Sequence, residues 1–329
     1  MKAIVNYEYG SPEVLRFEEV DKPTLKANEV LIKVHAASVN TADWYLLSGK
    51  PFLVRLDPGG LFKPKTRVLG GDVAGVIEDV GADVKQFQPG DHVYGDISGS
   101  GMGAFAEYVT APENVIANKP ENLSFEEAAA VPSAAVTALQ GIRDHGDLQK
   151  PGQSVLIVGA SGGVGTYAVQ IAKFYGAEVT AVCSTGKIDM VRSIGADHVI
   201  DYSKQDFPQI DQRYDLIVGV NGYHTLAEYK RALSSEGVYV MIGGTMSQIF
   251  QAMLLGPLMS KKRGKKFRGM GSTKINQKDL FVMKDLHEAG DVVPVIDRQF
   301  PLSETAAALR YLGEGHAKGK VVISVEQNL

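Results

Sequence analysis

Apolar and polar residues alternate over short distances in the first part of the chain. Up to residue 124 the pattern predicts strands at EVLIKVHAA (29–37) and AFAEYVTA (104–111), and a turn feeding a strand at QPGDHVYG (88–95). Glycine and proline punctuate these segments at short intervals, which is typical of a small, irregular all-β unit. We therefore expect the chain to begin with a β-rich domain.

The pattern changes at Ser124, whose spacing to Glu127 fits a helix capping box. From Ser154 onward, apolar runs such as VLIVG, suited to burial on both faces, alternate with helical patterns. Strands are predicted near 154–159, 177–183, 197–201, 214–219, 236–242 and 266–271, and helices near 163–175, 186–194 and 223–233. Strands and helices in this alternation predict a doubly wound parallel sheet of the Rossmann kind.

After Gly271 the pattern predicts a helix at 276–289, a strand in PVIDRQF, a helix at 303–313 and a closing strand in KVVISV. The predicted fold class is therefore α/β, with one domain inserted in another. A six-stranded Rossmann domain, residues 125–271, interrupts a β-rich domain formed by residues 1–124 and 272–329.

Four glycines crowd the exit of the first predicted parallel strand. They are Gly159, Gly162, Gly163 and Gly165, in the sequence GASGGVG. Glycine lets the backbone turn tightly and approach a pyrophosphate, and the free amides and dipole of a helix start favour the anion. We expect this loop, including Ser161 and Val164, to bind a dinucleotide. A turn without a ligand is the alternative.

The end of the second parallel strand bears on which dinucleotide binds. An NAD site usually places Asp or Glu there, on the ribose 2′-hydroxyl. This strand ends in Cys183 and continues with Ser184, Thr185 and Lys187, while Asp189 already lies in the following helix. A hydroxyl and an ammonium bind the 2′-phosphate that a carboxylate would repel, so NADPH is favoured over NADH. In the alternative, Ser184 or Thr185 only caps the helix and Lys187 is solvated.

Composition and charge narrow the class of protein. The net charge of −4 argues against nucleic acid as the main partner, and no apolar run reaches the ~18 residues of a membrane helix. The beginning of the chain lacks the apolar stretch of a signal peptide, so we expect a cytoplasmic location without membrane insertion. The single cysteine, Cys183, excludes an intrachain disulfide and a multi-cysteine zinc site.

Four segments resemble the medium-chain dehydrogenase/reductase superfamily, in particular its zinc-free quinone oxidoreductase branch, the zeta-crystallin-like proteins. They are AASVNTADW (36–44), LGGDVAGVIEDVG (69–81), VPSAAVTAL (131–139) and VLIVGASGGVG (155–165). The resemblance covers essentially the whole chain. It implies a GroES-like fold for the β-rich domain and a homodimer that joins the last Rossmann strands, here FRGMGST (267–273). Zinc alcohol dehydrogenases would place metal ligands near residues 38–40 and 71–72, where this chain has Ser38, Asn40, Gly71 and Asp72.

The resemblance also implies candidate site residues. Asn40 would lie close to the nicotinamide and the substrate, and Thr137 would face the nicotinamide end. A further candidate comes from the sequence itself: Tyr45 follows Asp43 in the same predicted loop and could donate a hydrogen bond to a carbonyl oxygen. Their alternatives are a turn cap for Asn40 together with Asp43, a packed hydroxyl for Thr137 and aromatic packing for Tyr45.

The remaining candidates concern the two ends of the cofactor. By the resemblance, Ser184, Lys187 and Tyr202 would flank the adenosine 2′-phosphate. Gly243 and Gly244 follow the strand VYVMI and would leave room for the nicotinamide at the carboxyl end of the sheet.

Without a zinc site, the expected reaction is hydride transfer from NADPH to an acceptor that disperses the incoming charge, a quinone or an α,β-unsaturated carbonyl. Two alternatives stay open: an NADP-linked aldehyde or ketone reductase, and a non-catalytic NADPH-binding protein. The segment 247–269 is interpreted as a lid or interface followed by a solvated basic loop, with RNA or anionic lipid as alternative partners of its basic half.

Overall fold

The computed structural model describes residues 1–56, 60–148, 150–221, 224–244, 256, 260, 264–271 and 273–325. The chain forms two compact units. Unit 1 comprises Met1–Ser133, Ile275–Ala289 and Pro294–Leu329, and unit 2 comprises Ala134–Lys274 and Gly290–Val293.

These boundaries lie several residues from the predicted ones, for two local reasons. Helix α2 (Phe125–Ala129) packs on strands β3 and β4 and so belongs with unit 1. Residues 290–293 belong with unit 2, where the side chain of Gln170 bonds both the amide and the carbonyl of Val293, at 2.8 and 3.0 Å.

Unit 2 contains the predicted parallel sheet. Its strands are β8 (Ser154–Val158), β9 (Glu178–Cys183), β10 (His198–Asp201), β11 (Tyr214–Gly219), β12 (Leu233–Met241) and β13 (Lys266–Gly269). They pair in the order β10-β9-β8-β11-β12-β13, and every pairing is parallel. The first strand, β8, therefore lies in the middle, and the chain reverses its direction across the sheet there. Ligands bind at the carboxyl edge of such a reversal.

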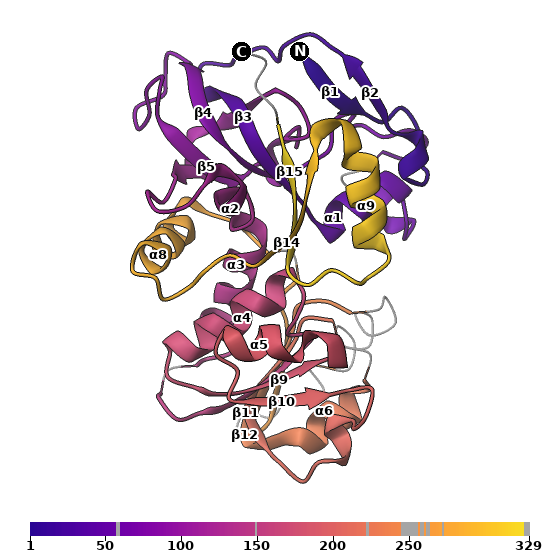
Figure 1. Ribbon diagram of the computed structural model, residues 1–329, viewed down its shortest axis with the longest axis vertical. Helices are drawn as coiled ribbons and strands as arrows, with labels where there is room; N and C mark the ends of the chain where they lie inside the picture. Colours follow the sequence, from indigo (N-terminus) through magenta and orange to yellow (C-terminus); the bar gives the residue numbers. More distant parts are fainter. Residues whose placement is uncertain are drawn as a thin grey trace. The chain divides into compact units, whose positions relative to one another are not determined.

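Helices cover the sheet of unit 2. They are α4 (Gly163–Phe174), α5 (Ile188–Ser193) and α6 (Leu226–Ala232), with α3 (Pro132–Gln140) and a π-helical turn at Gly141–His145 before β8 (Figure 1). Because the connections after β8 and after β11 run in opposite directions and crossovers are right-handed, α4 and α5 lie on one face and α6 on the other. Strand residues such as Leu156 and Ile217 are fully buried, as the apolar runs predicted.

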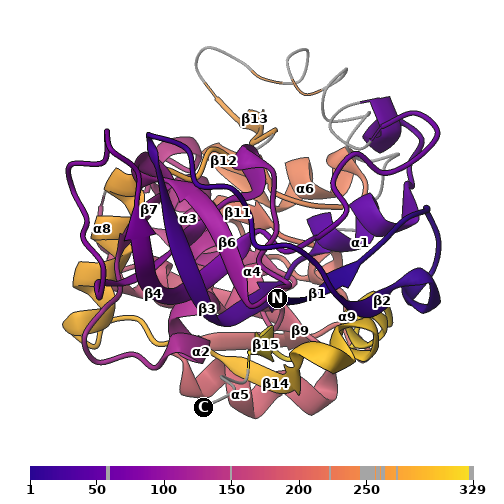
Figure 2. The ribbon, with the colours of Figure 1, turned by 90° about the horizontal axis from the view of Figure 1, so that it is seen from above.

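Unit 1 is built on a mostly antiparallel sheet. Its strands are β3 (Glu29–Val39), β4 (Asp72–Val80), β5 (His92–Asp96), β6 (Tyr108–Pro112), β7 (Ile116–Asn118), β14 (Ile296–Pro301) and β15 (Lys320–Ser324). They pair in the order β14-β15-β3-β4-β5-β7, and β6 lies beside β3 (Figure 2). Strands β1 (Lys2–Val5) and β2 (Arg16–Glu19) form a separate ribbon. The sequence pattern had not singled out β1, β2, β4 or β7 as strands.

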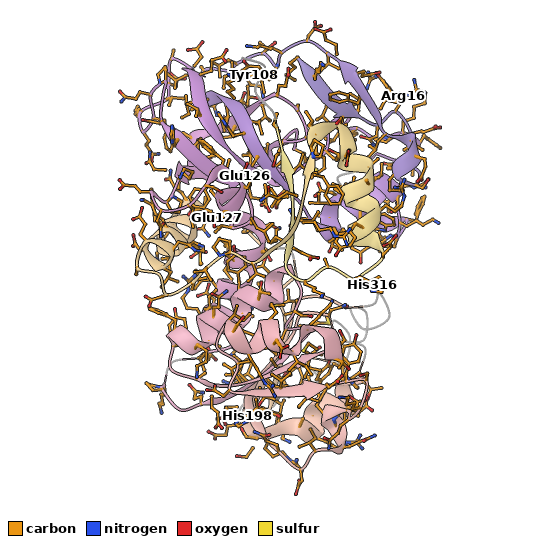
Figure 3. The ribbon with its side chains drawn as sticks, viewed as in Figure 1. Arg16, Tyr108, Glu126, Glu127, His198 and His316 are labelled. Carbon is orange, nitrogen blue, oxygen red and sulfur yellow. The ribbon has the colours of Figure 1, made fainter. Side chains whose placement is uncertain are left out.

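Helices complete unit 1: α1 (Thr41–Ser48), α2, α8 (Gln277–Glu288) and α9 (Thr305–Gly313). Helix α2 begins at the predicted capping box, in which Ser124 and Glu127 exchange side chain to backbone bonds of 3.2 and 2.8 Å; Glu126 and Glu127 lie in its first turn (Figure 3). Helix α1 replaces the loop expected around Asp43. The backbone amide of Asn40 donates to the Asp43 carboxylate at 2.8 Å, and this hydrogen bond caps the start of the helix.

Candidate active site

The glycine loop joins β8 to α4 and is shaped to receive a phosphate group. Gly159 has a φ of +85°, a conformation that side chains disfavour. A Cβ on Gly165 would lie 2.1 Å from the carbonyl oxygen of Gly159, so only glycine permits this close packing of helix on strand. A Cβ on Gly162 would meet nothing nearer than 3.8 Å, which leaves the loop open on that side.

The start of α4 supplies donors to the same place. The backbone amide of Thr166 is the first to make a helical bond, to the carbonyl of Gly162 at 2.9 Å, so the amides of Gly163, Val164 and Gly165 before it have no helical acceptor. Ser161 is largely buried between the strand and the helix. The loop therefore fits a pyrophosphate, because it combines open space, free amides and the positive end of a twelve-residue helix.

The predicted adenosine end lies at the carboxyl edge of the same sheet. Strands β9 and β10 pair with Cys183 opposite Asp201, and the amide of Tyr202 donates to the carbonyl of Cys183 at 3.1 Å. In the turn Thr185–Lys187, the backbone amide of Lys187 donates a hydrogen bond of 3.0 Å to the carbonyl of Ser184. The fold thus brings Ser184, Lys187 and Tyr202 to neighbouring strand ends, with 48% of Tyr202 exposed.

A carboxylate that was not predicted from the sequence also lies at this edge. Asp201 accepts a 2.6 Å hydrogen bond from the Thr185 hydroxyl, and its other oxygen accepts from the amide and hydroxyl of Ser203 at 3.1 and 2.6 Å. Bonds from Ser203 and Thr185 hold the pKa of Asp201 at about 2. The prediction rested on the end of β9 alone, whereas Asp201 ends the neighbouring strand. The order of strands in a Rossmann sheet is the signal that could have found it.

The predicted nicotinamide end is also built from strand ends. The amides of Ile242 and Gly243 donate to the carbonyl of Gly219 at 2.9 and 3.2 Å. A Cβ on Gly243 would lie 2.4 Å from the carbonyl oxygen of Val220, so the chain passes close to the end of β11. Gly244 follows directly. Both glycines therefore lie at the carboxyl edge, where the sequence predicted them.

Thr137 lies on α3 with 8% of its surface exposed. Its hydroxyl donates to the Thr273 hydroxyl at 3.2 Å, and Gln140 on the same helix donates to the carbonyl of Lys274 at 2.9 Å. These two bonds fix residues 273–274 to α3. The role predicted for Thr137 at the nicotinamide stays a prediction.

Asn40 belongs to a buried polar cluster in unit 1. Its amide nitrogen donates to Asp72 Oδ2 at 2.9 Å, and its amide oxygen accepts from Lys320 Nζ at 2.6 Å. Lys320 also pairs with Asp72 Oδ2 at 3.2 Å, and the Ser38 hydroxyl donates to the same oxygen at 2.6 Å. The Ser133 amide donates to the other oxygen of Asp72 at 2.9 Å. The contacts of Lys320 and Asp72 with Asn40 were not predicted from the sequence.

Two further carboxyl groups are buried near this cluster. Burial raises the pKa of Asp43 to about 7 although the amides of Asn40 and Gly70 donate to it. Burial, and then the charge of Asp72, raise the pKa of Asp96 to about 6. Asp43 accepts hydrogen bonds from the backbone of two segments, at Asn40 and at Gly70, and so holds them together.

Tyr45 lies on α1 rather than in a loop, and 40% of it is exposed. Its carbonyl accepts the bond from the Gly49 amide that closes the helix, at 2.8 Å. The predicted contact of its hydroxyl with a substrate remains a prediction.

No group of three or more His, Cys, Asp or Glu residues able to hold a metal ion occurs in the described ranges. His198, on β10, pairs with Glu178 at 2.9 Å, and His316 follows α9 (Figure 3). Within those ranges there is also no helix long and apolar enough to cross a membrane. Most of the segment 247–269, interpreted as a lid and a basic loop, lies outside the described residues.

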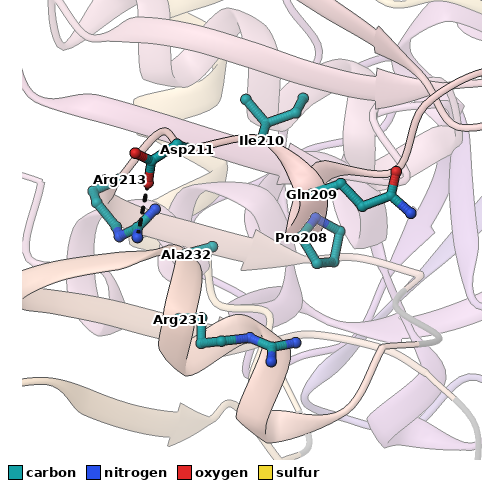
Figure 4. A pocket seen from close by; sticks show the side chains of 7 residues that line it. All are labelled: Pro208, Gln209, Ile210, Asp211, Arg213, Arg231 and Ala232. Carbon is teal, nitrogen blue, oxygen red and sulfur yellow. Dashed lines mark ion pairs between the residues drawn. The ribbon is translucent and has the colours of Figure 1, made fainter.

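A surface pocket in unit 2 lies at the opposite edge of the sheet from the glycine loop. It is lined by Pro208, Gln209, Ile210, Asp211, Arg213, Arg231 and Ala232 (Figure 4). Asp211 and Arg213 form an ion pair of 3.0 Å directly before β11 begins at Tyr214. Because nucleotides bind at the carboxyl edge, this pocket is not the cofactor site.

Comparison with known proteins agrees with this architecture. The family model for a zinc-binding dehydrogenase matches residues 194–323, and the model for the alcohol dehydrogenase GroES-like domain matches residues 26–121. The second match confirms the GroES-like fold expected for the β-rich domain.

Individual relatives match the whole chain. The 2-methylene-furan-3-one reductase of Solanum lycopersicum is 36% identical over 342 residues, which cover 98% of this chain and 79% of that protein. A chloroplast envelope quinone oxidoreductase homolog of Arabidopsis thaliana is 34% identical over 334 residues, 98% of both chains. The solved quinone oxidoreductase of Coxiella burnetii has a TM-score of 0.87 at 30% identity and covers 99% of both chains. The chain is therefore an oxidoreductase that belongs to the quinone oxidoreductase branch of the medium-chain dehydrogenase/reductase superfamily.

Proposed function

We propose that this protein reduces quinones or α,β-unsaturated carbonyl compounds with NADPH and without zinc. The observation that carries the proposal is the set of groups around Asp72. Relatives named as a furanone reductase and as quinone oxidoreductases support the acceptor class.

The groups around Asp72 do not fit a zinc ion. Zinc in proteins is held by thiolates, imidazoles and carboxylates. At the positions where zinc alcohol dehydrogenases would carry ligands, this chain offers a hydroxyl at Ser38, an amide at Asn40 and one carboxylate at Asp72. That carboxylate already accepts four hydrogen bonds, one of them from an ammonium group. A site that binds a metal cation would not already contain the fixed ammonium of Lys320 beside its carboxylate.

The glycine loop of unit 2 does fit a dinucleotide, and the bound reduced nicotinamide supplies a hydride. A quinone that gains this hydride and a proton becomes a hydroquinone. An enone gains the hydride at its β-carbon, and the enolate then takes a proton at its α-carbon. In both cases negative charge develops on the acceptor oxygen, and the Asn40 amide stabilises it as a hydrogen-bond donor.

The preference for NADPH is supported by the groups at the ends of β9 and β10. Ser184, Lys187 and Tyr202 offer a hydroxyl, an ammonium and a phenol to a 2′-phosphate. The carboxylate of Asp201 is engaged by three hydrogen bonds, which offset its charge at this edge.

We also propose a homodimer formed through β13. In the described part of unit 2 this strand lies at the end of the sheet order, so its outer edge offers backbone groups for pairing with a second copy. Size-exclusion chromatography with light scattering tests this. A cytoplasmic location stays a prediction, which cell fractionation tests.

The enzymatic proposal is tested by initial rates of NADPH and NADH oxidation with quinones, enones, alkenals and simple aldehydes, with a chelator present throughout. We expect turnover of the conjugated acceptors, a strong preference for NADPH and no effect of the chelator. Turnover of isolated carbonyls would favour an aldehyde or ketone reductase. Tight NADPH binding with every acceptor unchanged would favour a non-catalytic nucleotide-binding protein.

A further inference from the structure

Lys320 is a buried cation that the reaction described above does not use. Only 3% of it is exposed, and its ammonium lies 2.6 Å from Asn40 Oδ1 and 3.2 Å from Asp72 Oδ2. Lysine is rarely buried unless it is paired, because removing its charge from water is costly. Holding an ammonium at this place therefore requires the two acceptors that the fold supplies.

The sheet register explains how Lys320 reaches Asn40 across 280 positions of sequence. Strand β15 pairs antiparallel with β3, with Val321 opposite Val39. The residue before Val321 thus lies beside the residue after Val39. Strand β4 pairs with the other edge of β3 and places Asp72 opposite Ser38. The cluster is a product of three neighbouring strands rather than of a loop.

The ammonium determines which way the Asn40 amide faces. An ammonium can only donate, so it must meet the amide oxygen, and the carboxylate of Asp72 can only accept, so it must meet the amide nitrogen. One N–H of that nitrogen is used by Asp72 at 2.9 Å. The other makes only a long contact of 3.4 Å with the Ser38 carbonyl. This second N–H is the donor that remains for a ligand.

We propose that Lys320 is a positioning residue, which fixes the Asn40 amide so that its N–H donates to the oxygen of the acceptor during hydride transfer. This inference rests on the proposed function. It adds Lys320 as the residue that orients the N–H donor of Asn40. It also means that the positive charge at this site is the fixed ammonium of Lys320, at positions where zinc alcohol dehydrogenases would carry metal ligands.

The test compares variants in kinetics, cofactor binding and unfolding. Lys320→Met removes the charge and keeps the chain length, and Lys318→Met is the matched control, because Lys318 is exposed two residues away. We expect Lys320→Met to lower kcat at least tenfold and to change the KM of the acceptor less than threefold. NADPH affinity should stay within twofold, because Lys320 belongs neither to the glycine loop nor to the ends of β9 and β10. The control should match the wild type.

A double-mutant cycle separates positioning from a general structural effect. If Lys320 acts through Asn40, Asn40→Ala and Asn40→Ala/Lys320→Met have the same kcat, because the second change removes nothing further. Additive losses, or a wild-type kcat in Lys320→Met, would overturn the proposal.

Lys320→Met leaves Asp72 buried without its cation, and this variant alone can fail to fold. Lys320→Met/Asp72→Asn removes both charges, and we expect it to fold with a Tm near that of the wild type and a kcat still at least tenfold lower. A folded double variant with a wild-type kcat also contradicts the proposal.

If the wild type reduces no acceptor, the proposed function is refuted. Whether Lys320 holds the Asn40 side-chain amide in place can still be measured. With ¹⁵N-labelled asparagine, the side-chain amide signals of Asn40 are identified by their loss in Asn40→Ala. We expect these amide protons to exchange slowly with water in the wild type and at least tenfold faster in Lys320→Met/Asp72→Asn. Equal exchange rates would show that the amide is not held by this pair.

Discussion

The hydroxyl of Thr185 donates a 2.6 Å hydrogen bond to Asp201 and thereby ties together the ends of two neighbouring strands of unit 2. Thr185 lies two residues after the end of β9 at Cys183, and Asp201 is the last residue of β10. The bond engages a carboxylate at the edge where we propose that the adenosine 2′-phosphate binds. The charge of Asp201 and the bonds that offset it should therefore both affect the choice between NADPH and NADH.

Removing the charge of Asp201 and removing its hydrogen bond from Thr185 should change the preference for NADPH over NADH in opposite directions. Asp201→Asn keeps an acceptor for Thr185 and abolishes repulsion of the phosphate, so we expect the ratio of kcat/KM for NADPH over NADH to rise about threefold. Thr185→Val removes the 2.6 Å hydrogen bond to Asp201 Oδ2 and leaves that oxygen with the Lys204 ammonium at 3.6 Å, and the ratio should fall. Both shifts should shrink at high salt, because exposed charges are screened. The same direction in both variants would show that this edge does not contact the phosphate.

Lys187 is the cation that we expect to bind the 2′-phosphate directly. Lys187→Met should lower kcat/KM for NADPH about tenfold, the size of one charge-assisted hydrogen bond. The value for NADH should change less than twofold, because NADH lacks the phosphate. Lys230→Met, an exposed site on α6, is the control. An equal loss with both cofactors would place Lys187 outside the phosphate site.

The Rossmann sheet and the glycine loop could be predicted from the sequence because their signals are local. Buried parallel strands are continuous apolar runs, and a tight phosphate turn needs glycine at fixed spacing. The first helix of unit 1 was missed for a related reason. Asn40 and Asp43 cap a turn and a helix equally well, so their spacing alone did not distinguish the two.

The buried cluster could not be predicted because it depends on register between distant strands. Lys320 is the first residue of an otherwise apolar strand and has the sequence context of a solvated lysine. Only the pairing of β15 with β3 brings its ammonium to Asn40. The place of Asp201 could not be predicted for the same reason, although its partner is closer in sequence. Only the pairing of β10 with β9 places it beside Cys183.

Two glycines of the phosphate loop should respond differently to alanine. Gly165→Ala places a methyl group 2.1 Å from a backbone oxygen, and such overpacking costs about 1–3 kcal/mol, so Tm should fall. Gly162→Ala has 3.8 Å of clearance and an ordinary φ of −86°. It should keep the wild-type Tm and weaken NADPH binding at least tenfold, measured by nicotinamide fluorescence. Unchanged binding in Gly162→Ala would argue against the pyrophosphate at this loop.

The buried carboxyl group of Asp43 should make stability depend on pH. Its pKa is about 7 in the folded protein and about 3.9 in an unfolded chain. Between these values the folded state holds a proton that the unfolded state has lost, so the free energy of unfolding falls as pH rises from about 4 to about 7. The slope from one group is at most about 1.4 kcal/mol per pH unit. Asp43→Asn should make the decline of Tm shallower, most clearly between pH 6 and pH 7, above the pKa of about 6 of Asp96, and Asp83→Asn, at an exposed site, should retain the decline. Parallel declines in the wild type and Asp43→Asn would mean that Asp43 is ionised throughout this range.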